Sequence, residues 1–211
     1  MLAESYIEQM HRPQVGIPGM FGMVSDSYGL GHFLETLPDG KTAVWHGGQG
    51  LGWMTHFHIV PSTGDGIVVV ANSQRSWPFF ARVLDEWSTW AGVGQPGMAR
   101  ISTATVGVRI LIGALFLAAA WLMLRVVFGM VADERRPAGR QRPGVMQVVQ
   151  AIVGVSILAG LTWAALQDYL FVSSIFPDES FWLGASVLAL AIALLLAALL
   201  PVRRAAPESR G

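Results

Sequence analysis

The sequence contains no cysteine and a single lysine, and its formal net charge is zero. Without cysteine there is no disulfide framework, no thiolate nucleophile and no cysteine-ligated metal site. Without an excess of positive charge there is no electrostatic basis for binding nucleic acid. Charged residues make up 13% of the 211 residues, against about 25% in ordinary soluble domains. The chain therefore carries much more apolar sequence than a small soluble protein. No motif in it indicates a cofactor, and we expect none.

Two signatures of serine nucleophiles are also absent. A Ser-x-x-Lys motif requires a lysine, and the only lysine, Lys41, has Pro38 three residues before it. The Gly-x-Ser-x-Gly sequence that places a serine on a sharp turn in other hydrolases does not occur either. We therefore expect this chain to hydrolyse nothing by itself.

Three long apolar stretches occupy the second half of the chain, at about residues 105–131, 144–166 and 181–201. At the rise of an α-helix, each is long enough to cross the hydrocarbon core of a bilayer, which is about 30 Å thick. Residues 105–211 are therefore predicted to be an all-α region of three transmembrane helices. The lipid bilayer is the first expected partner.

Arginine distribution predicts the orientation of these spans. The connection between the second and third spans has no lysine or arginine, whereas arginines follow the first and the third spans, at Arg135, Arg136, Arg140, Arg142, Arg203, Arg204 and Arg210. Cationic connections stay in the cytoplasm. We expect a multi-pass protein of the cell membrane with a cytoplasmic C-terminus and an extracytoplasmic N-terminal domain.

Residues 1–92 have the pattern of an α+β partial domain, joined to the spans by a linker at 93–104. Strands are predicted at 28–36, 42–46, 53–60 and 67–70, with turns at 37–40 and 61–65. Apolar residues at helical spacing predict a closing helix at 77–90. The expected fold is an antiparallel meander of about four strands plus a C-terminal helix. The core of such a domain is small. Residues 1–9 also lack the basic and apolar parts of a secretory signal. We therefore expect an upstream portion of the domain to be missing.

Several short segments of this domain follow one another in a specific order. They are Tyr28-Gly-Leu-Gly-His32, then Trp45-His-Gly-Gly-Gln-Gly-Leu-Gly52, then Pro61 with a turn, and an apolar strand that ends in Ala71-Asn-Ser73. In this order and spacing, residues 1–92 resemble the C-terminal part of serine β-lactamase-like hydrolases. That family includes class C β-lactamases, penicillin-binding proteins and related esterases. The resemblance covers less than half of the chain.

The resemblance implies roles for four consecutive residues. His46 would take the cationic or proton-transferring position of the active-site cleft, Gly47 and Gly48 would allow close approach of the substrate, and the backbone N–H of Gln49 would donate to the oxyanion. Independently, glycine is the residue that lets a ligand approach a strand backbone closely. The alternative is a glycine-rich hairpin loop with His46 as a half-buried polar residue.

By the same resemblance, the chain is a truncated, membrane-anchored segment of a serine hydrolase. An intact relative would transfer the acyl group of an amide or ester to a serine and then hydrolyse it, with a cell-wall peptide or ester as substrate. Ser25-Asp26-Ser27 only superficially echoes a Ser-Asp-Asn motif, and we interpret it as a loop. The alternative is a non-enzymatic membrane protein with an extracytoplasmic binding module, whose helices associate through small residues such as Gly154 and Gly160.

Two further groups of residues have open interpretations. His56 and His58 lie on one face of a predicted strand, at a spacing that suits zinc, or they are solvent-facing strand residues. Trp77, Trp87 and Trp90 fit either the packing of the helix on the sheet or a surface resting on the membrane. Trp163 and Trp182 lie near span ends and suit an aromatic belt.

Overall fold

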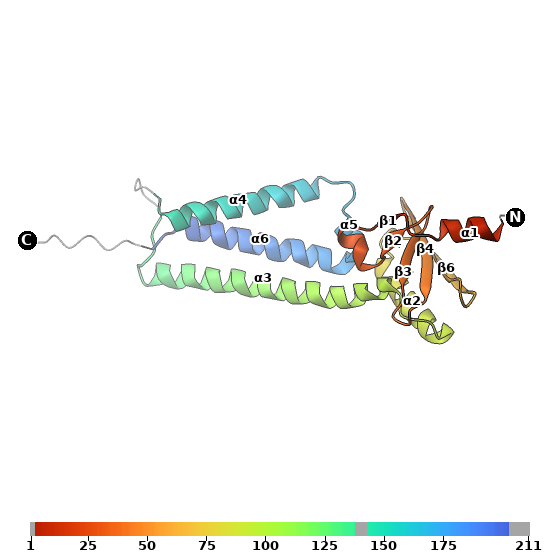
Figure 1. Cartoon of the computed structure of the whole chain (residues 1–211). Helices are drawn as coiled ribbons and strands as arrows, with labels where there is room; N and C mark the ends of the chain where they lie inside the picture. Colours follow the sequence, from red (N-terminus) through yellow and green to blue (C-terminus); the bar gives the residue numbers. More distant parts are fainter. Residues whose placement is uncertain (1–2, 138–142, 203–211) are drawn as a thin grey trace, which may run out of the picture. The chain divides into compact units, whose positions relative to one another are not determined.

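The computed structural model describes residues 3–137 and 143–202. It contains two compact units (Figure 1). The N-terminal unit comprises Met1–Gly107 together with Phe171–Pro177, and the helical unit comprises Val108–Leu170 and Asp178–Gly211. The segment Phe171–Pro177, which lies between two apolar helices in the sequence, therefore belongs to the N-terminal unit.

The N-terminal unit is built on one antiparallel sheet of six strands. The strands follow the chain order, so that each pairs with the next one, and they are β1 (Val15–Gly16), β2 (Ser27–Tyr28), β3 (Phe33–Thr36), β4 (Thr42–Gly50), β5 (Trp53–Val60) and β6 (Asp65–Ala71). The prediction of an antiparallel meander is confirmed. The predicted number of about four strands is too low for two reasons. β1 lies outside the predicted strands, and the strand predicted at 28–36 is divided into β2 and β3.

The segment predicted as one strand at 28–36 is divided into β2 and β3. The interruption is a turn in which the Gly29 N–H donates to the His32 carbonyl at 2.8 Å. Gly31 has a φ of 88°, a left-handed conformation that glycine adopts at little cost. The glycines of the Tyr-Gly-Leu-Gly-His sequence therefore reverse the chain instead of extending the strand.

The glycine-rich segment after His46 belongs to a strand. β4 continues to Gly50, which pairs with Trp53 of β5, so the hairpin loop is the two-residue Leu51-Gly52. Gly52 has a φ of 81°, a left-handed conformation that glycine adopts at little cost. The prediction that the strand ends at 46 is therefore wrong. Of the hairpin-loop alternative, the loop is limited to Leu51-Gly52, whereas His46 is half-buried as that alternative had it. The sequence pattern does not reveal this strand, because glycine has no side chain and a low strand propensity. The strand forms because β5 pairs with it along its backbone.

Besides the sheet, residues 3–92 contain three helical segments. The helix α1 (Glu4–Met10) precedes the sheet, a 3-10 turn η1 (Gly19–Met23) links β1 to β2, and α2 (Trp77–Ala91) packs on one sheet face. α2 ends at Gly92, whose φ of 67° forms a left-handed cap. Its apolar face joins the core, which includes Trp45, Met54, Val60, Trp77, Phe80, Ala81, Leu84 and Trp87. The core position predicted for Trp77 and Trp87 is confirmed, whereas Trp90 is 83% exposed.

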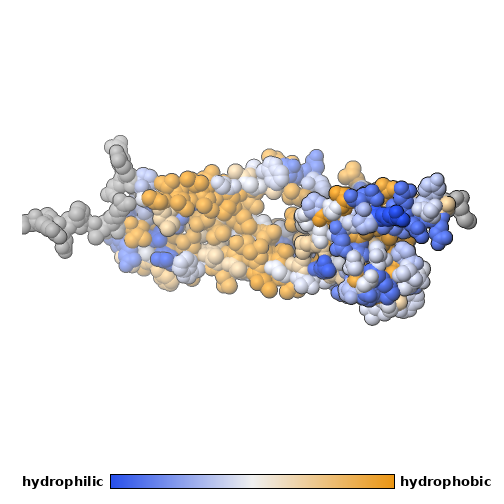
Figure 2. Space-filling model, viewed as in Figure 1, coloured by the Kyte–Doolittle hydropathy of each residue, from blue (hydrophilic) through white to orange (hydrophobic). Residues whose placement is uncertain are grey.

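The described residues include three helices that are long and apolar enough to cross a membrane. They are α3 (Arg100–Val131), α4 (Val145–Ala165) and α6 (Pro177–Leu199), and α5 (Phe171–Ile175) lies between the last two. Their surfaces are largely hydrophobic (Figure 2). α3 starts within the predicted linker 93–104 and follows a 3-10 turn, η2 (Gly97–Ala99), because Ile101 packs into the core of the N-terminal unit. The arginines at 140, 142, 203, 204 and 210 lie outside the described residues.

Candidate functional site

The end of β4 forms one wall of an open cavity within the N-terminal unit. Side chains from η1, β3, β5, α2 and α5 form the rest of it, and the lining residues are Phe21, Phe33, Trp45, Gly47, Gly48, Gln49, Met54, His56, Trp77 and Phe171. Three of the four predicted site residues, Gly47, Gly48 and Gln49, therefore line the same cavity. We call it the glycine cavity.

The two glycines fit closely against β5. A Cβ atom at Gly48 would lie 2.8 Å from the hydroxyl oxygen of Thr55, and one at Gly47 would lie 3.2 Å from the Thr55 carbonyl oxygen. The Gly48 N–H also donates to the Thr55 hydroxyl at 3.1 Å. The packing of the hairpin thus leaves little space for a Cβ atom at either position.

Gln49 is held by residues that are distant in the sequence. Its side-chain amide donates to the Gln74 carbonyl at 3.2 Å and to the Ser174 hydroxyl at 2.9 Å. The Ser174 hydroxyl in turn donates to the same Gln74 carbonyl. Ser174 is buried whereas Gln49 is exposed, so these bonds lie at the partly buried edge of the unit. They fasten α5 to the end of β4.

Phe171 is the residue of α5 that lines the cavity. Its ring centroid lies 5.4 Å from that of Phe21 and 5.6 Å from that of Trp77. Sequence reasoning missed Phe171 and Ser174 because it considered only the charges of the connection between the second and third spans. The available signal was the presence of Phe171, Val172, Ile175 and Phe176, four large apolar residues, in a short connection.

His46 is not among the residues that line the glycine cavity. Its ring is half-buried and lies 5.6 Å from the Phe33 ring and 6.2 Å from the Tyr28 ring. The structure therefore separates this imidazole from the cavity wall formed by the next three residues of β4.

His56 and His58 are buried, with 2% and 1% of their surfaces exposed. The interpretation as solvent-facing residues is therefore wrong: they share the α2 face of β5 with Met54 and Val60. Desolvation, with a smaller effect of His58 and His46, lowers the pKa of His56 to about 3, and desolvation lowers the pKa of His58 to about 4. Across residues 3–137 and 143–202, no group of three or more His, Asp or Glu side chains is arranged to hold a metal ion.

Glu35 of β3 is a buried carboxyl group that the sequence reasoning did not identify. Its Oε2 accepts a hydrogen bond from the Gly97 N–H at 2.8 Å, and its Oε1 lies 3.4 Å from His58 Nε2. Burial raises the pKa of Glu35 to about 7. Because His58 is neutral near pH 7 and Glu35 is only partly ionised there, the pair is not a full ion pair. Glu35 holds η2, the turn that leads into α3.

The segment Ser25-Asp26-Ser27 has a structural role. The Ser25 hydroxyl donates to the Leu34 carbonyl at 2.8 Å, and an Asp26 carboxylate oxygen accepts from the Thr36 N–H at 2.6 Å. Both side chains thus fasten the turn before β2 to β3. Neither is among the residues that line the glycine cavity.

No protein-family model matches the chain, and no curated protein is significantly similar to it.

Proposed function

We propose that this chain is a membrane-anchored module related to serine β-lactamase-like hydrolases, and that its glycine cavity is one part of an acyl-transfer site. The observation that supports the proposal most is the convergence of Gly47, Gly48 and Gln49 on one open cavity. Gly47 pairs with His56, which also lines the cavity, so the absence of a side chain at Gly47 lets a carbonyl group approach the strand closely from the cavity side. In the family that the sequence resembles, the corresponding strand borders the substrate.

The proposed reaction of the complete site is acyl transfer followed by hydrolysis. A serine hydroxyl attacks the carbonyl carbon of an ester or amide, and its proton passes through a base to the departing alcohol or amine. Water then attacks the acyl-serine ester, releasing the acid and restoring the serine hydroxyl. Because the 211 residues contain no Ser-x-x-Lys, we assign the serine and its base to polypeptide outside them. Residues 47–49 contribute the wall against which the carbonyl lies.

The proposed location is the outer side of the cell membrane. The arginines after the first span favour a cytoplasmic connection there. In a chain that crosses three times, the N-terminal unit and the connection between α4 and α6 lie on the same side. The bonds of Ser174 with Gln49 and Gln74 agree with that requirement.

The decisive experiment uses a serine-directed fluorophosphonate on the tagged full chain, purified in detergent from its native membranes. We expect the label on a serine of copurifying polypeptide and none on residues 1–211. Gly47→Val, which places a side chain in the cavity wall, should lower that labelling. Gly16→Val should not, because Gly16 is exposed and a Cβ atom added there would meet no other atom within 4 Å. Label on this chain, absence of any labelled partner, or equal labelling of the two variants would refute the proposal.

The competing function is a non-enzymatic membrane protein with an extracytoplasmic binding module. One observation favours it: His46, which the resemblance puts at the proton-transferring position, is not among the residues that line the glycine cavity. A binding module needs no serine, so it predicts that no fluorophosphonate-labelled polypeptide copurifies. The same experiment therefore separates the two functions.

A further inference from the structure

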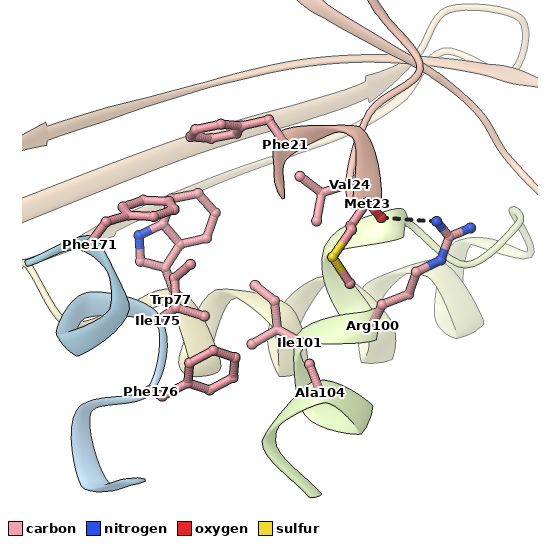
Figure 3. Close-up of a pocket in the computed structure, with 10 residues that line it drawn as sticks. All are labelled: Phe21, Met23, Val24, Trp77, Arg100, Ile101, Ala104, Phe171, Ile175 and Phe176. Carbon is pink, nitrogen blue, oxygen red and sulfur yellow. Dashed lines mark hydrogen bonds between the residues drawn. The ribbon is translucent and has the colours of Figure 1, made fainter. Parts of the chain in front are cut away.

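A second cavity of the N-terminal unit is lined almost entirely by apolar side chains (Figure 3). We call it the apolar pocket, and its lining residues are Phe21, Met23, Val24, Trp77, Arg100, Ile101, Ala104, Phe171, Ile175 and Phe176. Arg100 contributes its aliphatic stem, because its guanidinium is turned to the Met23 carbonyl, to which it donates at 2.9 Å.

The apolar pocket and the glycine cavity adjoin each other. Phe21, Trp77 and Phe171 line both of them, and the Phe171 ring lies between the other two, with centroids 5.4 and 5.6 Å away. These three aromatic side chains form the shared wall. A ligand that reaches from one cavity to the other passes this wall.

The other end of the apolar pocket is formed by residues that lead directly into candidate membrane spans. Ile101 and Ala104 belong to α3, which continues as the first span, and Phe176 immediately precedes α6. In Figure 3 these three side chains lie on the side of the pocket away from Phe21. The pocket is thus continuous in sequence with the apolar surfaces of α3 and α6.

We infer that the apolar pocket binds the hydrocarbon chain of an acylated membrane amphiphile. The carbonyl group of the amphiphile reaches the shared wall beside the glycine cavity, and the methylenes next to it lie in the apolar pocket. The rest of the hydrocarbon chain runs past Ala104 and Phe176 into the bilayer. This inference rests on the proposed function and names its substrate class: a lipid ester or amide and not a water-soluble peptide.

The chemistry of the lining favours a hydrocarbon chain over a peptide. Peptide N–H and C=O groups would find almost no hydrogen-bond partners among these side chains, and burying such groups unpaired is costly. One buried donor is available at the shared wall. Trp77 Nε1 has no hydrogen-bond partner within the described part of the chain, and it lies on the side of the ring next to Phe171 (Figure 3). It suits a single carbonyl oxygen.

The test uses the full chain in phosphatidylcholine nanodiscs that contain a phosphatidylcholine with a photoreactive diazirine near the acyl carbonyl. After irradiation, mass spectrometry maps the crosslinked residues. We expect crosslinks at Phe21, Met23 or Ile101. Ala104→Phe fills the membrane-side end of the pocket and should reduce them about tenfold, the loss expected when about two methylenes lose their contacts. Ala118→Phe, at an exposed position on the same helix, is the matched control and should leave them unchanged.

Crosslinks confined to the lipid-facing surfaces of the three spans, or equal crosslinking of Ala104→Phe and Ala118→Phe, would overturn the inference. Ala104→Leu, a smaller substitution, provides the same comparison if the phenylalanine variant does not fold. Crosslinking requires no serine and no turnover. If the pocket is crosslinked but no fluorophosphonate-labelled partner is found, the binding of a hydrocarbon chain is supported and the acyl-transfer site is rejected. If a labelled partner is found but the pocket is not crosslinked, the acyl-transfer site is supported and a lipid substrate is rejected.

Discussion

The side-chain amide of Gln49 donates to the hydroxyl of Ser174 at 2.9 Å, across 125 residues of sequence. Gln49 lies at the end of the glycine-rich strand, and Ser174 lies in the short helix between the second and third candidate spans. The bond therefore joins the cavity wall to a connection of the membrane helices. A shift of α5 would therefore displace or break this hydrogen bond at the end of β4.

A double-mutant cycle on Gln49→Ala and Ser174→Ala measures this connection. We expect a coupling free energy of about 1 kcal/mol, because the pair is one partly buried hydrogen bond. The readout is hydrogen exchange of residues 171–176, which should become faster in each single variant. Ser62→Ala, in an exposed turn, should not change that rate. Strict additivity of the two substitutions would show that the bond does not hold α5.

The buried ionisable groups predict how the stability of the N-terminal unit depends on pH. His56 and His58 have lowered pKa values, so their contribution is present above pH 6.5 and is lost as the pH falls toward 4 and 3. Glu35 has a pKa raised from 4.5 to about 7, so its contribution is present below pH 4.5 and is lost as the pH rises through 7. Between pH 4.5 and 6.5 these three groups together bind one proton more in the unfolded chain, so their combined contribution to stability should rise by about 1.4 kcal/mol per pH unit.

Glu35→Gln tests this balance, with urea unfolding followed by tryptophan fluorescence at several pH values. The substitution removes the opposing carboxyl group, so the rise between pH 4.5 and 6.5 should steepen to about 2.8 kcal/mol per pH unit. Glu86→Gln, at an exposed position of α2, should keep the wild-type slope. A Glu35→Gln slope that is unchanged or shallower would contradict the assignment of a neutral buried carboxyl group.

Gly48→Ala should destabilise the hairpin of β4 and β5. The new Cβ would lie 2.8 Å from the Thr55 hydroxyl oxygen, so Thr55 must move and its bond with the Gly48 N–H is lost. We expect a loss of about 1–3 kcal/mol, measured as a lower urea midpoint. Gly16→Ala, which meets no atom within 4 Å, serves as the comparison and should change stability little. Equal stability of the two variants would show that β5 accommodates the extra carbon.

Arg135→Ala should loosen the end of α6. The Arg135 guanidinium donates to the Leu200 carbonyl at 2.7 Å and to the Ala197 carbonyl at 3.5 Å, and the last carbonyls of a helix have no partner within it. We expect a loss of about 1–2 kcal/mol and faster hydrogen exchange over residues 196–200. Arg136→Ala, which removes only an exposed pair with Asp133, should have no measurable effect. Similar exchange in both variants would refute this capping role.

The proposed orientation can be tested with single cysteines, because the chain has none of its own. In intact cells, a membrane-impermeant maleimide should label Gly16→Cys and Asp168→Cys. Glu134→Cys, in the connection after the first span, should be labelled only after permeabilisation. These three residues are exposed, so accessibility depends on the side of the membrane. The reverse pattern would place the N-terminal unit in the cytoplasm.

The sequence alone determined the elements whose signal is local. Long apolar runs specify α3, α4 and α6, because a span needs only length and hydrophobicity. The helical spacing of Phe80, Leu84 and Trp87 likewise specified α2 and its buried face. Strand alternation identified β5, and the apolar run at 67–70 identified β6.

Only the tertiary structure decided the features that depend on a distant partner. The residues at 47–50 are a strand because β5 pairs with them, and His56 and His58 are buried because α2 covers that face. Glu35 is held by Gly97, and α5 completes the cavity from the connection between two spans. Such placements depend on long-range contacts, which the local pattern of side chains does not encode.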